Sequence, residues 1–189
     1  PCSEFMFLDN SACNLASLNL TRFVGEDGVF DSRGFRHAVR TFIFAQEIIV
    51  SNAKYPTEPI GTNSDKYRPL GLGFANLGGL LMSWGLAYDS DAGRACAAAV
   101  AALMTGEAYV ASAMLAEKVG PFAEYQKNAQ SMARVIRKHR AALEAVDERY
   151  VPGGLMKDAR QAWDIAVSMG KQAGFRNAQV TLLAPTGTI

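Results

Sequence analysis

Apolar residues recur along most of this chain with the spacing of one helix face, i, i+3/i+4, i+7. The pattern predicts helices over residues 32–52, 91–118, 121–143 and 156–173. Asp31 or Ser32 can cap the first helix, and Gly174 can end the last in a left-handed conformation. The first helix should turn one face to the core: Phe35, Val39, Phe42, Ile43, Gln46, Ile49 and Val50.

Shorter apolar runs predict strands near residues 4–8, 68–73 and 180–183. Residues 14–23 mix apolar and polar positions, and their leucines at 15, 18 and 20 are expected to face a core. Prolines and a glycine between residues 56 and 63 predict a long loop. A strand, several helices and a further strand indicate an α/β fold with long helical insertions.

The Gly71-x-Gly73 pair invites comparison with a dinucleotide-binding loop. That fingerprint needs a third glycine at the position of Asn76, and no long apolar strand precedes the pair. We therefore expect a tight strand-to-helix turn here, with close backbone packing around the glycines.

Composition narrows the class of protein. The chain is 49% hydrophobic and 20% charged, as globular domains are, and its 19 basic and 18 acidic residues argue against a nucleic-acid surface. No fully apolar run is long enough to suggest a membrane span. Three cysteines do not form a disulfide framework, which favours a reducing, cytoplasmic setting. His37 and His139 lie far from the cysteines, so no metal site is expected.

The first residues carry the most distinctive chemistry. Cys2, Glu4 and Cys13 stand close together in a chain that is otherwise poor in cysteine. If Cys2-Ser3-Glu4 is extended, side chains alternate, and the Cys2 sulfur and the Glu4 carboxylate share one face. Such a pair can act on one small molecule. Cys96, among alanines, is expected to be a small buried apolar residue instead.

The last residues form a second constellation. Pro185-Thr186-Gly187-Thr188 offers two hydroxyls and free backbone N–H groups in a turn that glycine permits. If a helix follows, its positive end would point at the same place, and such groups together bind phosphate. A purely structural turn is the alternative reading.

Taken together, these blocks resemble the catalytic subunit of ribonucleotide reductases, most closely the class II, adenosylcobalamin-dependent type. The resemblance runs from end to end in family order. It rests on Pro1–Asp9, Ser11–Leu20, Arg68–Gly73 and Gly174–Ile189.

The resemblance implies a helix-rich fragment of a ten-stranded α/β barrel with a central finger loop. Residues 1–189 would be a single partial domain, from the finger loop to the phosphate-binding loop, inactive alone. Cys2 would be the thiyl-radical cysteine, Glu4 the adjacent carboxylate and Cys13 half of a redox pair whose partner lies upstream in the family. The substrate's phosphates would be held by Ala184, Pro185, Thr186, Gly187 and Thr188.

The same resemblance implies a ribonucleotide substrate, an adenosylcobalamin cofactor, a thioredoxin-type reductant and a possible homodimer, with no nucleic acid or membrane as partner. Two alternatives stay open. One is a class I large subunit, although the cysteines of that class are usually farther apart than Cys2 and Cys13. The other is a helical interaction module with incidental cysteines, which leaves both ends of the chain unexplained.

Overall fold

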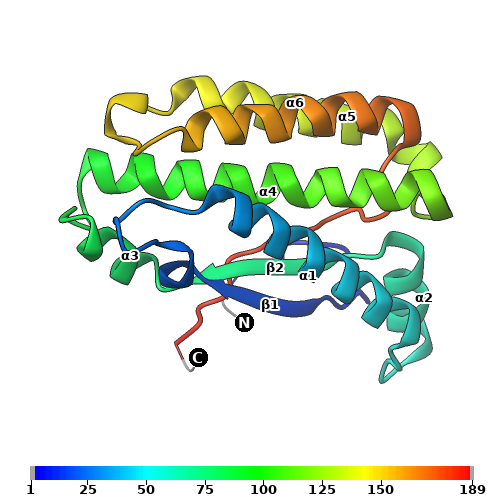
Figure 1. The fold of residues 1–189 in the computed structure, drawn as a ribbon. Coiled ribbons are helices and arrows are strands. Elements are labelled where there is room, and N and C mark those ends of the chain that lie inside the picture. The colour runs from blue at the N-terminus through cyan, green and yellow to red at the C-terminus, as the bar shows by residue number, and fades with distance from the viewer. Residues whose placement is uncertain (1–2, 188–189) are drawn as a thin grey trace.

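A small parallel sheet lies under long helices in the computed structural model, which describes residues 3–187 (Figure 1). Strand β1 (Asn14–Asn19) pairs in parallel with β2 (Leu70–Ala75). On the other edge of β2, residues 179–182 run parallel through a single bridge between Leu72 and Thr181. We call these residues the 179–182 segment. Three chain segments therefore run in parallel, with β2 in the middle.

Six α-helices occur in residues 3–187, and short 3-10 turns separate some of them. The α-helices are α1 (Ser32–Asn52), α2 (Glu58–Tyr67), α3 (Leu77–Ser83), α4 (Asp91–Val119), α5 (Tyr125–Ala142) and α6 (Leu155–Ala173). The 3-10 turns are η1 (Leu20–Phe23), η2 (Leu143–Ala145) and η3 (Glu148–Tyr150).

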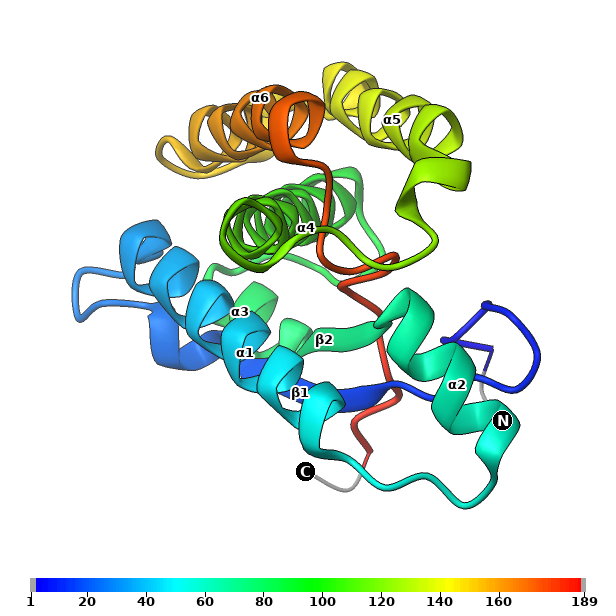
Figure 2. The same ribbon diagram turned by 90° about the vertical axis from the view of Figure 1, so that its right-hand side faces the viewer.

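The elements stack in three tiers, which Figure 2 shows from the side. The sheet lies lowest with α1 and α2, α4 crosses above it, and α5 and α6 lie on top. Parallel strands need a crossover between them. Helices α1 and α2 form the crossover between β1 and β2, and α3 to α6 form the one that leads to the 179–182 segment.

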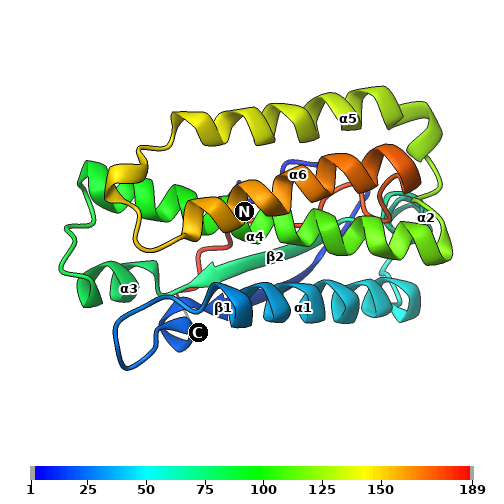
Figure 3. The same cartoon turned by 45° about the horizontal axis from the view of Figure 1, so that its top comes forward.

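Helix α4 is the centre of the core because its small residues let neighbours approach on several sides. It packs against α6 above it and α1 below it (Figure 1, Figure 3). The Trp163 side chain of α6 is 1% exposed, and its indole N–H donates to Ala102 O over 2.9 Å. By length and composition α4 could cross a membrane, but 67% of its most apolar stretch is buried inside the protein. Other helices, not lipid, thus cover its apolar surface.

The predicted helices are confirmed, with differences at their edges. Asp31 caps α1 by accepting from Gly34 N, while α5 begins at Tyr125 and not at Pro121. In α1, Phe42 and Ile49 are 41% and 50% exposed, so the expectation that they face the core is wrong.

The predicted strands and the predicted loop agree less well with the structure. Residues 4–8 form no strand, and 180–183 contributes only one bridge. Leu15 is 55% exposed because it alternates with the buried Leu18 onto the uncovered face of β1. The expected loop at 56–63 is largely helix α2, with Pro59 in its first turn, where a missing N–H costs nothing.

Candidate functional site

The described site residues near the start of the chain are Glu4 and Cys13, and the fold brings them together. Cys13 is half-buried and directly precedes β1. Burial raises the pKa of its thiol, a backbone hydrogen bond partly offsets this, and the negative charge of Glu4 raises the pKa further. One carboxylate oxygen of Glu4 is buried without a hydrogen-bond partner in residues 3–187. A thiol and a carboxylate are therefore neighbours in a partly dry environment.

The backbone leading to Glu4 differs from the expected extended strand. Ser3 has a φ of 60°, in the left-handed region, so the backbone is not extended at this residue. The condition on which the expected alternation of side chains depended is therefore not met at Ser3. Cys2, Thr188 and the other terminal residues, 1 and 189, lie outside the described residues. The roles expected for Cys2 and Thr188 stay predictions.

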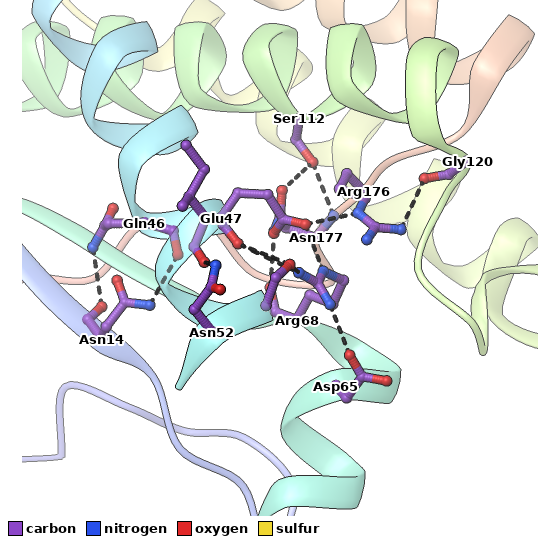
Figure 4. Close-up of polar contacts among 12 residues, drawn as sticks. Asn14, Gln46, Glu47, Asn52, Asp65, Arg68, Ser112, Gly120, Arg176 and Asn177 are labelled. Carbon is purple, nitrogen blue, oxygen red and sulfur yellow. Dashed lines mark hydrogen bonds and ion pairs between the residues drawn. The ribbon is translucent and has the colours of Figure 1, made fainter. Parts of the chain in front are cut away.

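Hydrogen bonds fix the backbone on both sides of Cys13. Ala12 N donates to the hydroxyl of Ser64 on α2 over 3.0 Å. On the other side, Asn14 and Gln46 of α1 bond reciprocally: Asn14 Nδ2 donates to Gln46 O over 3.1 Å, and Gln46 Nε2 donates to Asn14 O over 3.0 Å (Figure 4). Two helices thus hold the position of the thiol.

The next residue of α1, Glu47, is the centre of a buried ionic network (Figure 4). Its carboxylate accepts from Arg68 Nε over 2.5 Å, from Arg176 Nε over 2.7 Å and from Asn177 Nδ2 over 2.7 Å. Glu47 and Arg68 are 5% and 3% exposed, so little water screens their attraction. Ser112 of α4 completes the network by bonding to both the N–H and the side chain of Asn177.

This network ties together the amino ends of the parallel segments. Asn14 begins β1, Arg68 lies two residues before the start of β2, and Asn177 lies two residues before the 179–182 segment. All three are held by one turn of α1, at Gln46 and Glu47. The network therefore sets the position of Cys13, at one end of the sheet, relative to the loop that follows the 179–182 segment at the other.

That loop holds the predicted phosphate-binding residues. Ala184 and Thr186 line a cavity of about 630 Å³ between α3 and α4. Thr186 also lines a second cavity, of about 500 Å³, with Ser17, Asn19, Ala75 and Asn76. Thr186 has a φ of 53°, which is uncommon for a residue other than glycine. The loop borders hollow space, but phosphate binding by Ala184–Thr188 stays a prediction.

The glycines of β2 have a packing role and form no nucleotide loop. Gly71 and Gly73 lie inside the strand. A Cβ on Gly73 would lie 2.5 Å from Leu182 O, so the 179–182 segment can approach only because this position is glycine. The expected close packing is confirmed. The turn comes later, at Asn76, whose φ is 68°.

Two polar residues at the carboxyl ends of the strands, Asn19 and Asn76, were not predicted as site residues. Asn76 Nδ2 donates to Asn19 Oδ1 over 3.2 Å and to Thr21 Oγ1 over 3.3 Å. One signal was present: asparagine is among the few residues that readily adopt the left-handed conformation, and Asn76 stands between an apolar run and a glycine pair. Nothing in the sequence pairs it with Asn19.

The remaining candidates behave as ordinary structural residues. Cys96 is 0% exposed on α4, which confirms that it is a small buried residue. His37 is exposed on α1. Among residues 3–187, no three histidine, cysteine, aspartate or glutamate side chains converge as metal ligands would.

Comparison with known proteins agrees with this geometry. The family described as "Ribonucleotide reductase, barrel domain" matches residues 1–189. Three similar curated relatives, each called a vitamin B12-dependent ribonucleotide reductase, come from Rhodopirellula baltica (54% identical), Agrobacterium fabrum (46%) and Streptomyces avermitilis (47%). Each match covers 100% of this chain but only 18%, 16% and 20% of the respective relative.

The family match spans both chemical constellations and the helices between them. It gives no support to a helical interaction module with incidental cysteines. The helix-rich structure with its small parallel sheet fits a piece of an α/β barrel. The chain belongs to the ribonucleotide reductase family and represents part of its barrel domain.

Proposed function

We propose that the whole protein carrying this chain reduces ribonucleotides to 2′-deoxyribonucleotides, for DNA synthesis, by thiyl-radical chemistry. The observation that carries the proposal is that the half-buried thiol of Cys13, just before β1, lies near enough to Glu4 for the carboxylate charge to raise its pKa. One oxygen of Glu4 is buried without a hydrogen-bond partner in residues 3–187, which costs free energy unless a ligand supplies the partner. Thiols with a shifted pKa, such as that of Cys13, are found more often at active sites than elsewhere. The names of the relatives point to the same reaction.

The reaction starts from a thiyl radical on Cys2. This radical takes the hydrogen atom from C3′ of the ribose, giving a Cys2 thiol and a carbon radical. The Glu4 carboxylate accepts the 3′-hydroxyl proton while the 2′-hydroxyl, protonated by a thiol, leaves as water. Cys13 and its partner cysteine together give two electrons and two protons and become a disulfide. Glu4 then returns its proton to the 3′ oxygen, Cys2 returns its hydrogen to C3′, and the thiyl radical is regenerated.

The half-buried environment of Cys13 suits this role. A raised pKa keeps its sulfur as a thiol at neutral pH, and only a thiol can give a proton as well as an electron. The partner cysteine is not Cys96, which is fully buried in α4. It belongs to another part of the whole protein. A thioredoxin-type protein would then reduce the disulfide to two thiols. We place the whole protein in a reducing cytoplasm and expect that its subunit can form a homodimer.

The proposed cofactor is adenosylcobalamin, because the relatives are named as B12-dependent. The described residues do not by themselves form a site for so large a group beside Cys13. Met6 and Leu8, on the segment that leads to Cys13, are 79% and 48% exposed, and the two cavities at the sheet lie at its other end. We assign the corrin-binding surface to other parts of the protein and derive no step through it.

The test is turnover by the whole reductase subunit and its Cys2→Ser variant. Serine cannot carry the thiyl radical, so reduction should fall to background while nucleotide binding survives. Cys96→Ala is the matched control and should keep its turnover. Survival of reduction in Cys2→Ser would refute the proposal. A requirement for cobalamin, with no second subunit, would separate class II from class I, and the isolated 189-residue chain should show no turnover.

A further inference from the structure

The smaller cavity at the carboxyl end of the sheet has an uncharged polar wall. Its volume is about 500 Å³, and its lining residues are Ser17 and Asn19 of β1, Ala75 and Asn76 at the end of β2, and Thr186. Ser17 and Asn19 lie two residues apart on a strand, so their side chains share a face. Amide and hydroxyl groups from three separate segments therefore converge beside the predicted phosphate loop.

A chain of hydrogen bonds fixes which way the amide of Asn19 points. Thr21 N can only donate, and it donates to the Asn19 side chain over 3.3 Å, so that atom must be the oxygen Oδ1. Asn76 Nδ2 and Thr21 Oγ1 donate to the same oxygen over 3.2 Å and 2.9 Å. With Oδ1 accepting from three donors, the NH₂ group of Asn19, a solvent-exposed residue, has no hydrogen-bond partner in residues 3–187 and is accessible to a ligand.

The backbone is held in an unfavourable conformation at this same place. Asn76 and Thr186 have φ values of 68° and 53°. Left-handed conformations at residues other than glycine cost energy and cluster at binding sites. Space is also kept for the Asn76 amide: a Cβ on Gly79 would lie 2.4 Å from Asn76 Oδ1. The fold thus maintains the Asn76 side chain in contact with Asn19.

We propose that Asn19 is a substrate-binding residue whose NH₂ group donates to the phosphate end of the ribonucleotide, and that Asn76 is the residue that positions it. Thr186, from the predicted phosphate-binding loop, lines the same cavity. This inference rests on the proposed function for the identity of the ligand. Among residues 3–187, no charged side chain lines the cavity, so recognition by these residues is by neutral hydrogen-bond donors. Such donors bind phosphate with weaker salt dependence than a lysine or arginine cluster.

The test uses the whole reductase subunit and two readouts. One is direct calorimetric binding of inorganic pyrophosphate, which does not depend on turnover. The other is the KM for a ribonucleotide. Loss of one hydrogen bond to a charged group weakens binding by about 10- to 100-fold. We expect Asn19→Ala to weaken both readouts by that factor and to change kcat by less than about threefold. The control is Asn128→Ala, at an exposed position of α5, which should change neither the pyrophosphate affinity nor the KM.

Asn76→Gly separates positioning from stability. Glycine keeps the left-handed backbone without strain but removes the amide that holds Asn19. The variant should unfold at the same denaturant concentration as the parent, or a higher one, while its pyrophosphate affinity falls several-fold. Unchanged pyrophosphate affinity in Asn19→Ala, or no pyrophosphate binding by the parent, would overturn the inference. Persistence of reduction in Cys2→Ser would instead overturn the proposed function and leave the pyrophosphate result standing.

Discussion

Replacing Glu47 by glutamine should be among the most damaging single changes in this chain. The carboxylate is 5% exposed and accepts from Arg68, Arg176 and Asn177. Glutamine has nearly the same shape, but it removes the negative charge and points an NH₂ group at one of these donors. Arg68, which is 3% exposed, then lies buried with its main counter-charge gone. Breaking a buried pair by removing one partner costs about 3–5 kcal/mol.

The assay is urea unfolding of the 189-residue chain, followed by the fluorescence of buried Trp163. We expect the free energy of unfolding to fall by about 3–5 kcal/mol in Glu47→Gln. The control is Glu117→Gln, the same chemical change at an exposed site of α4, which should cost less than about 0.5 kcal/mol. If both variants lose the same amount, the network does not hold the strand ends together and our account of it is wrong.

Three further predictions concern packing and titration. Gly73→Ala places a Cβ 2.5 Å from a backbone oxygen, so it should lower the free energy of unfolding by about 1–3 kcal/mol in the same urea assay. The control is Gly78→Ala, whose added Cβ would have no atom within 4 Å and which should leave the stability unchanged or raise it. The thiol of Cys13 should be alkylated with a pH midpoint above that of a free cysteine, and Glu4→Gln should lower the midpoint by removing a negative charge. Burial and a nearby lysine lower the pKa of His139, so the unfolded chain binds its proton more tightly. The free energy of unfolding should therefore fall as the pH drops below about 6.5, and it should fall less in the His139→Gln variant.

The sequence alone determined the four long helices and the family to which the chain belongs. Helix formation depends on neighbours three and four residues away and on capping groups beside them, and all of these can be read locally. Asp31 therefore marked the start of α1 correctly, and Gly174 the end of α6. The family resemblance followed from short blocks whose order is fixed along the chain, and the family match confirmed it.

Only the tertiary structure decided which face of each helix or strand is buried and which distant residues it contacts. Leu15 was expected in the core, but within residues 3–187 no layer covers its side of β1, and it is 55% exposed. Residues 56–63 were expected to form a loop, but most of them belong to helix α2. Glu47 meets Arg176 across 129 positions of sequence, and Asn19 meets Asn76 across 57. No periodicity links positions so far apart. These contacts depend on the register of the parallel segments, which backbone hydrogen bonds and the glycines of β2 set. That register exists only in the folded chain.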